Sequence, residues 1–340
     1  MKGVGEPEYF IGAEMGRLSG EYTESGSTST WSAKTYLTNV IARIEKEHGI
    51  LRAYTCPMDP DYHPELDEST LLQGDDISIF RMFIGCVQWA ITLGRMDIVY
   101  VTTMLSRYNM APREGHTADM KKLFGYLKIH VKGKITFDTR TLDVPHATYL
   151  ESASWTQTYG DIKEEVPPGC PEPKMKLIDI TVYFDASFAC DLITRISVTG
   201  IIVFLGSTPM RWHCKKQNTV ETSTYGAEIV AGRLGVEAVL EFRYVIRMLG
   251  IPIIGPTRML GDNMSVIQNC SLPGSQLKKK HNAIAYHRIR EYVTAKIIKL
   301  GHVRSEMNYA DLCTKALNML KLHGLCKDLL FSTDGFRGVS

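Results

Sequence analysis

Four acidic residues in separate segments of the chain have neighbours that suit a metal-binding site. Carboxylate oxygens are the hard ligands that Mg²⁺ prefers, and the ion keeps several waters beside them. Two such ions about 3.5–4 Å apart can activate a water and stabilise the leaving oxygen of a phosphodiester. The four acids are Asp185, Glu228, Asp262 and Asp311. If the folded chain brings them together, they form the core of a nuclease.

Each of these acids lies in a segment whose pattern predicts a definite element. Asp185 lies in an apolar strand-like run over 177–189, and Asp262 closes a second short strand. Glu228 comes about one turn into a long helical pattern over 224–249. Asp311 lies near the start of an expected C-terminal helix, where an anion is favoured. Repulsion among the four carboxylates would oppose their full ionisation unless cations bind.

The second half of the chain predicts a mixed sheet with helices on both faces. Strands over 177–189, 197–205 and 210–216, joined by short connections, predict three antiparallel strands. The long helix, the strand that ends at residue 262, helices near 266 and over 283–295, and a strand over 296–303 follow in that order. Helices between the later strands indicate parallel pairing, so we expect an α/β fold with five strands.

The first half of the chain has a different pattern, dominated by amphipathic helices. Apolar residues recur at helical spacing over 38–47, 77–92, 98–108 and 116–129. Residues 151–176 follow and resemble a linker, because the stretch 164–173 is too rich in proline for a helix or a central strand. We therefore expect a mainly helical segment over 1–150, a linker over 151–176, and the domain with the sheet after it.

The composition is that of an ordinary globular protein. The 340 residues suffice for two domains, and a hydrophobic content of 44% can bury a core. No run of about 18 apolar residues occurs, so we expect no membrane partner. The eight cysteines include no Cys-x-x-Cys pair and fit no zinc site, which favours reduced thiols in an intracellular protein.

A basic stretch between residues 278 and 304 stands out in the charge pattern. The whole chain has a formal charge of only +2, whereas this stretch has eight Lys and Arg residues and Glu291 as its only acid. Such a stretch can follow a phosphate backbone. The alternative is a solvated helix face.

Seven short segments around the acids form a distinctive set through their order and spacing along the chain. They are 185–191, 194–200, 212–220, Ser223-Thr224-Tyr225-Gly226-Ala227-Glu228, Gly261-Asp262-Asn263, 286–291 and Tyr309-Ala310-Asp311-Leu312-Cys313-Thr314-Lys315. Together they resemble the ribonuclease H domain of copia-type LTR retrotransposon polyproteins, over about 177–320. The first half resembles the region just upstream in the same polyproteins, on segments 9–15, 84–89, 95–98, 105–108 and 126–128.

The resemblance implies a ribonuclease H-like fold and activity: two-metal hydrolysis of RNA in RNA–DNA hybrids, as part of reverse transcription. It implies that the four acids are catalytic and hold two Mg²⁺ or Mn²⁺ ions. It also implies a proton-handling role for His302, nine residues before Asp311; the alternative is a strand-end histidine without a role. The nucleic-acid-binding residues that we expect are Gln217, Ser223, Thr224, Asn263, Lys279, Lys280, His281 and Arg290. Ser223 and Thr224 are equally consistent with simple helix capping.

The resemblance also implies a domain organisation. Residues 1–150 correspond to a remnant of the reverse transcriptase thumb and connection, 177–320 to the ribonuclease H-like domain, and 321–340 to a C-terminal tail. The family's polymerase aspartates lie upstream of this sequence, so we expect no polymerase activity, and the missing palm and fingers become a second expected partner. The expected location is a cytoplasmic virus-like particle or the nucleus; the sequence leaves the oligomeric state open.

A second interpretation is a decayed or co-opted fragment that only binds nucleic acid. Two altered positions favour it: Arg304 stands where the family usually has proline, and Met96 interrupts the family's pattern between Arg95 and Asp97.

Overall fold

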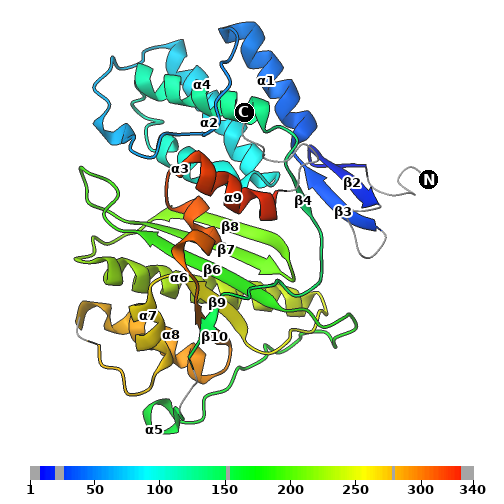
Figure 1. Ribbon diagram of the computed structural model, residues 1–340, viewed down its shortest axis with the longest axis vertical. Helices are drawn as coiled ribbons and strands as arrows, with labels where there is room; N and C mark the ends of the chain where they lie inside the picture. Colours follow the sequence, from blue (N-terminus) through cyan, green and yellow to red (C-terminus); the bar gives the residue numbers. More distant parts are fainter. Residues whose placement is uncertain (1–7, 20–26, 151–153, 278–279, 331–340) are drawn as a thin grey trace. The chain divides into compact units, whose positions relative to one another are not determined.

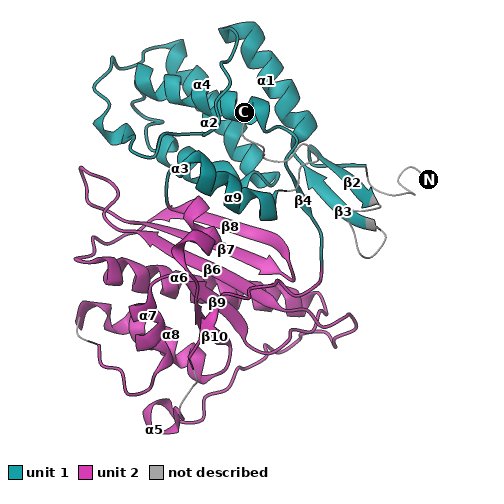
Figure 2. Cartoon of the chain, in the orientation of Figure 1, with its two compact units in different colours: residues 1–138, 315–340 teal, residues 139–314 magenta. Residues whose placement is uncertain are grey.

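A computed structural model describes residues 8–19, 27–150, 154–277 and 280–330 of the chain. Contacts group the chain into two compact units: unit 1 is Met1–Asp138 with Lys315–Ser340, and unit 2 is Thr139–Thr314 (Figure 2). Residues 321–330, which we expected in a tail, therefore pack with unit 1. The sequence-based domain bounds stay a prediction, because compact units describe packing rather than ancestry.

Unit 1 contains a four-stranded antiparallel sheet that the sequence did not predict. Its strands are β1 (Tyr9–Phe10), β2 (Ala13–Ser19), β3 (Ser27–Ser32) and β4 (Lys134–Thr136), in the order β1-β2-β3-β4. β3 consists of Ser, Thr and one Trp, so it lacks the apolar alternation that marks a strand in a sequence.

Four helices of unit 1 agree closely with the expected patterns: α1 (Lys34–His48), α2 (Asp75–Thr92), α3 (Val99–Ser106) and α4 (Glu114–Ile129). A fifth helix of this unit, α9 (Met319–Leu329) in the C-terminal segment, was not predicted. A buried ion pair lies among them, in which Arg95 Nη2 donates to Asp97 Oδ2 over 2.6 Å. The hydroxyl of Tyr126, on α4, donates to the same carboxylate oxygen over 2.8 Å. This network ties the start of α3 to α4.

Unit 2 is built on a six-stranded mixed sheet with the order β5-β10-β9-β6-β7-β8 (Figure 1). β6 (Ile180–Ser187), β7 (Val198–Leu205) and β8 (Thr208–Lys216) are antiparallel neighbours. β9 (Thr257–Gly261) is parallel to β6, and β10 (Ile298–His302) is parallel to β9. These five strands confirm the expected fold class. The sixth, β5 (Thr148–Tyr149), adds a short antiparallel edge beside β10.

Helices cover the two faces of this sheet. α6 (Thr224–Met248) packs against β6 and β7, with α7 (Met264–Ser271) and α8 (Ala283–Thr294) beside it. The core on this face includes Phe184, and Gly261 lets the ring pass close by, because a Cβ there would lie 2.6 Å from Phe184 Cζ. On the other face Tyr183 packs edge-on against Tyr309, with ring centroids 4.9 Å apart. Tyr309 begins a 3₁₀ helix, Tyr309–Cys313, rather than the α-helix that we expected around Asp311.

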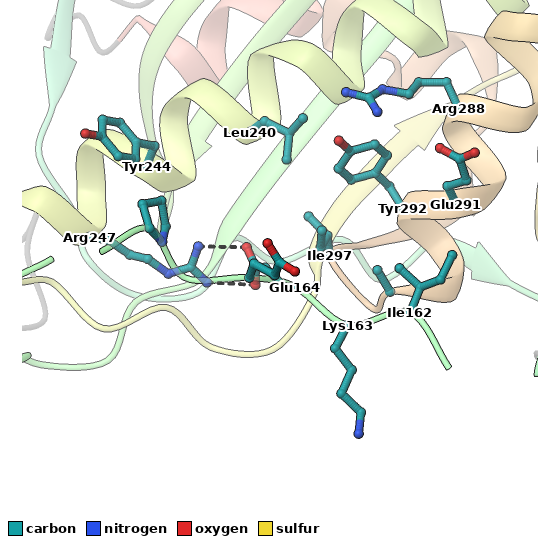
Figure 3. A pocket seen from close by; sticks show the side chains of 13 residues that line it. Ile162, Lys163, Glu164, Leu240, Tyr244, Arg247, Arg288, Glu291, Tyr292 and Ile297 are labelled. Carbon is teal, nitrogen blue, oxygen red and sulfur yellow. Dashed lines mark hydrogen bonds and ion pairs between the residues drawn. The ribbon is translucent and has the colours of Figure 1, made fainter. Parts of the chain in front are cut away.

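The expected linker runs along unit 2 and is attached to it at two places. The short helix α5 (Thr156–Tyr159) brings the hydroxyl of Tyr159 within 2.5 Å of His287 Nδ1, on α8. Farther along, the Glu164 carboxylate accepts paired hydrogen bonds from Arg243 and Arg247, both on α6, at 2.7–2.9 Å. Figure 3 shows the pair with Arg247. The proline-rich segment therefore has defined partners although it forms little regular structure.

Candidate metal centre and nucleic-acid interface

Three of the four predicted acids meet at one edge of the sheet in unit 2. Asp185, Glu228 and Asp262 each offer a carboxylate oxygen, and these oxygens all lie within 4.8 Å of one another. Asp185 and Glu228 are buried, with 1% and 3% of their surface exposed, whereas Asp262 is partly exposed. The group therefore has a buried floor and one member that a substrate can reach.

Strand register explains why two of these acids are neighbours. β6 and β9 are parallel, and their pairing sets Tyr183 opposite Leu260. Asp185 and Asp262 each come two residues later, so the same register carries both to one level of the sheet. Glu228 reaches this level from α6, whose N-terminus is fixed where Ser223 Oγ accepts a hydrogen bond from Gly226 N at 3.2 Å.

The donor set of this group suits a hard divalent cation. All three ligands are carboxylates, and no histidine or cysteine belongs to the group. Mg²⁺ and Mn²⁺ favour such oxygen ligands, and Mg²⁺ usually retains waters beside one or two carboxylates. Three carboxylates so close together repel one another, which a bound cation would relieve. The residues present therefore fit the predicted metal ions.

Asp311 is not among the three acids whose carboxylate oxygens lie within 4.8 Å of one another, and its part in metal binding stays a prediction. It is fully buried within the 3₁₀ helix Tyr309–Cys313. The segment around it nevertheless contacts β6: Asn308 Nδ2 donates to the carbonyl of Phe184 over 3.1 Å, and the hydroxyl of Thr314 donates to Asp185 Oδ2.

His302 and Ser305 both contact Asp262. Nε2 of His302 lies 3.2 Å from the carbonyl oxygen of Asp262, a geometry in which Nε2–H donates. Oγ of Ser305 donates to Asp262 Oδ2 over 2.5 Å. His302 therefore lies beside the carboxylate group, as its position in the sequence suggested. Ser305 was missed, since only its place three residues after His302 could have indicated it.

Gln217 has a structural position that corrects its expected contact with a nucleic acid. It is buried, with 3% of its surface exposed. Its Nε2 donates to Thr199 Oγ1 over 3.0 Å and to the carbonyl of Ala227 over 2.9 Å. Because Ala227 directly precedes Glu228, Gln217 helps to position a member of the carboxylate group instead of contacting a sugar.

Two other expected binding residues are helix caps, and one is exposed. Ser223 caps α6, and the side chain of Asn263 caps α7 by accepting from Val266 N at 3.2 Å. Thr224 is exposed on the first turn of α6. Capping and substrate binding are compatible at Ser223 and Asn263, because both residues are partly exposed.

A basic cavity of about 290 Å³ lies beside the N-terminal half of α6. Four of its lining residues have basic side chains: Lys215 and Lys216 at the end of β8, Arg233 on α6, and His281. Its acidic member, Glu221, lies 3.2 Å from His281 Nε2. Lys280 is exposed next to it, and Lys279 lies outside the described residues. Lys215, Lys216 and Arg233 were not predicted, because they lie outside the basic stretch 278–304.

Arg290 is buried, which corrects its expected place on a nucleic-acid-binding surface. Only 2% of its surface is exposed. Its guanidinium donates to the carbonyls of Asn269, Leu272 and Pro273 at 2.7–2.9 Å and stacks over the ring of Trp155 at 4.7 Å. Arg290 therefore satisfies the C-terminal carbonyls of α7 and cannot reach a phosphate.

A second cavity of unit 2 lies away from the carboxylates. It has a volume of about 500 Å³ and lies between α6, α8 and the segment 162–167 (Figure 3). Leu240, which lines it, is twelve residues after Glu228 on α6, or about 18 Å along the helix. We therefore assign no part in metal binding to this cavity.

Comparison with known proteins agrees with the sequence resemblance. No family model matches the chain. The chain is 26% identical over 317 residues to the retrovirus-related Pol polyprotein from transposon RE1 of Arabidopsis thaliana. This alignment covers 92% of this chain and 18% of the polyprotein. The chain is 27% identical over 194 residues to the corresponding polyprotein from transposon TNT 1-94 of Nicotiana tabacum, covering 56% of this chain and 14% of the polyprotein.

The curated homologues of this chain are retrovirus-related Pol polyproteins of plant transposons. The chain spans less than a fifth of their length. Among solved structures, LC11-RNase H1 in complex with an RNA/DNA hybrid overlaps 40% of this chain and 94% of that chain, with 13% identity and a TM-score of 0.33. RNase H1 from Halobacterium salinarum also overlaps 40% of this chain and 94% of its own chain, with 17% identity and a TM-score of 0.31.

Among the described residues, none of the helices is long and apolar enough to cross a membrane.

Proposed function

We propose that the chain is a ribonuclease H-type endonuclease that cleaves RNA in RNA–DNA hybrids by two-metal hydrolysis, as part of retrotransposon reverse transcription. The observation that supports this most is the meeting of Asp185, Glu228 and Asp262 within 4.8 Å. Three separate elements supply them, and the sequence homologues are transposon Pol polyproteins. A capping or solvated role for each acid alone would not bring them to one point.

Each residue of the site would have a distinct role in metal binding or proton transfer. Asp185 and Glu228 form the buried part of the ligand set, and Asp262 is the ligand nearest to solvent. When bound, Mg²⁺ or Mn²⁺ lowers the pKa of an attacking water and stabilises the departing oxygen of the phosphodiester. His302 holds the backbone of Asp262 and would be the proton-handling group beside the carboxylates.

The hybrid would bind across the basic cavity beside α6. Lys215, Lys216 and Arg233 would contact phosphates, which positions a duplex without reading its sequence. Lys280 and His281 extend this basic surface, and Thr224 with Asn263 lies nearer the carboxylates, where a hydroxyl or amide can contact a ribose 2′-hydroxyl.

Cleavage of a labelled RNA–DNA hybrid in the presence of Mg²⁺ or Mn²⁺ tests this proposal. We expect Asp262→Asn to lower the rate by more than the roughly 10–100-fold that loss of an outer-shell group costs a metal site. Asp161→Asn is the matched control, because Asp161 is an exposed carboxylate paired with Lys163 in the same unit. Equal rates for wild type and Asp262→Asn would refute the proposal.

A protein that binds nucleic acid without cutting it is the second candidate. The position of Asp311 outside the carboxylate group favours it, because the set expected for catalysis is then incomplete. This candidate predicts salt-sensitive binding of the hybrid in EDTA and no cleavage when either metal is added.

A further inference from the structure

The cavity between α6, α8 and the segment 162–167 has the size and lining of a small-molecule site. Its volume of about 500 Å³ lies within the roughly 300–1,000 Å³ that such sites span. Buried Ala295 and Ile297 line it, and Leu240 and Tyr292, also in the lining, pack against the same hydrophobic core. The cavity is therefore apolar where it meets the core, and a ligand with an apolar body would fit there.

An ion-pair network holds one wall of this cavity in place. Glu164, in that wall, accepts hydrogen bonds from Arg243 and Arg247 on α6 at 2.7–2.9 Å. Nη1 of Arg243 also donates to the carbonyl of Gly255 and to Thr257 Oγ1, each over 3.1 Å. The wall is thus attached to α6 and to the start of β9, so a ligand would not need to order it on binding.

The charges that line this cavity balance. Three lining side chains are cationic and three are acidic: Lys163, Arg247 and Arg288, with Glu164, Glu165 and Glu291. Arg247 is already paired with Glu164 (Figure 3). Because the formal charge of the lining is zero, the cavity favours neither a simple cation nor a simple anion over a ligand whose own charges balance.

Two opposite charges on α8 are available to such a ligand. Arg288 and Glu291 both line the cavity and are three residues apart, a spacing at which side chains are neighbours on a helix. Within the described part of the chain, no hydrogen bond or ion pair joins either side chain to another residue. The Arg288 guanidinium instead lies over the ring of Tyr292, 4.6 Å from its centroid. Figure 3 shows these three side chains on one side of the cavity and Leu240 opposite them.

We propose that this cavity binds a small zwitterion with an apolar body, such as an apolar amino acid. The carboxylate of the ligand would accept hydrogen bonds from Arg288, and its ammonium group would donate to Glu291. Its side chain would lie against Leu240 and Ile297. Arginine presents paired donors that match a carboxylate, and an ionised glutamate accepts from an ammonium group. This binding needs neither a metal ion nor the carboxylate group of unit 2.

Calorimetric titration of the full chain in EDTA, without nucleic acid, tests this proposal separately from nuclease activity. The probes are L-phenylalanine, phenethylamine, which lacks the carboxylate, and 3-phenylpropionate, which lacks the ammonium group. We expect wild type to bind L-phenylalanine more tightly than either fragment. Arg288→Gln should weaken L-phenylalanine and 3-phenylpropionate roughly 5-fold or more but leave phenethylamine unchanged, because only a carboxylate loses its partner. Glu291→Gln should weaken L-phenylalanine and phenethylamine instead.

Two further variants distinguish the cavity from a general effect of charge. Leu240→Trp keeps every charge but fills the apolar part, and we expect it to abolish binding of all three probes. Glu306→Gln is the control, because Glu306 is an exposed carboxylate of unit 2 that does not line the cavity. Wild-type affinity for L-phenylalanine in both Arg288→Gln and Glu291→Gln, or no saturable binding to wild type, would overturn the proposal. Tighter binding of either fragment than of L-phenylalanine would overturn it as well.

Discussion

The hydroxyl of Thr314 donates a hydrogen bond to Oδ2 of Asp185, and both residues are buried. This contact joins the segment that carries Asp311 to the central strand of the sheet. Groups that hydrogen-bond a metal ligand fix its direction and tune its affinity. The segment after β10 therefore supports the carboxylate group although Asp311 does not belong to it.

Thr314→Val should remove this hydrogen bond while nearly preserving the shape of the side chain. We expect a loss of about 1–3 kcal/mol in the free energy of unfolding, because a buried carboxylate oxygen loses its donor. We also expect metal affinity to fall roughly 10-fold or more. Urea unfolding and calorimetric titration with Mn²⁺ measure the two effects. Thr314→Ser keeps the hydroxyl and should retain most of the metal affinity; an equal loss in both variants would argue against this role.

Gly200 should not tolerate alanine, because the segment around Asp311 packs directly on it. A Cβ at Gly200 would lie 2.6 Å from Thr314 Cγ2 and 2.7 Å from the carbonyl oxygen of Ala310. Since a backbone atom is involved, the segment must shift, and we expect a cost of about 1–3 kcal/mol in unfolding free energy together with weaker Mn²⁺ binding. Gly274→Ala is the control, because no atom lies within 4 Å of its added Cβ. Wild-type stability in Gly200→Ala would contradict the packing.

Arg290→Gln should destabilise the protein without changing the salt dependence of nucleic-acid binding. The substitution leaves buried carbonyls at the end of α7 without their donor, at a cost of about 3 kcal/mol. Arg288→Gln, two residues earlier, changes an exposed arginine and should leave the unfolding free energy nearly unchanged. Thermal unfolding and salt titrations of binding measure both properties. A stable Arg290→Gln variant with a lower salt slope would restore Arg290 to the binding surface.

The ion pairs of Glu164 should make part of the stability depend on acid pH. Partial burial alone would raise the pKa of Glu164, but hydrogen bonds from Arg247 and Arg243 outweigh it and hold the pKa at about 2, below the ordinary 4.5. Because the folded-state pKa is the lower one, this contribution is complete above about pH 4.5 and is lost as the pH falls toward 2. The difference in unfolding free energy between wild type and Glu164→Gln should shrink over that range.

Urea unfolding of wild type and Glu164→Gln at a series of pH values measures this difference. Glu165→Gln is the control, because the exposed Glu165 directly follows Glu164. A difference between wild type and Glu164→Gln that stays constant from neutral pH to pH 2 would show that the ion pairs do not contribute in this way.

The sequence predicted the sheet of unit 2 and three members of the site because local patterns determine them. β6 is a mostly apolar run that contains Asp185, and α6 has helical periodicity through Glu228. Parallel neighbours that end at one edge then bring Asp185 and Asp262 together. Each of these inferences needs only the period of a segment and the order of the strands.

Contacts between distant segments were not predictable in the same way. In the sequence, the buried Arg290 cannot be told from an exposed basic residue. Its hydrogen-bond partners are carbonyls 17–21 positions earlier in the chain. Asp311 lies in a 3₁₀ helix, and the sequence around it did not distinguish that turn from an α-helix. The basic cavity beside α6 combines β8, α6 and the start of α8, so no single stretch of charge revealed it.

Calorimetric titration of the full chain with Mn²⁺ tests most directly whether Asp185, Glu228 and Asp262 form one metal site. We expect wild type to bind the ion, and Asp185→Asn, Glu228→Gln and Asp262→Asn each to abolish or severely weaken that binding, because each removes one ligand of the same group. Asp161→Asn should bind as wild type does. Undiminished Mn²⁺ binding in any of the three ligand variants, with the fold intact, would contradict a shared metal site.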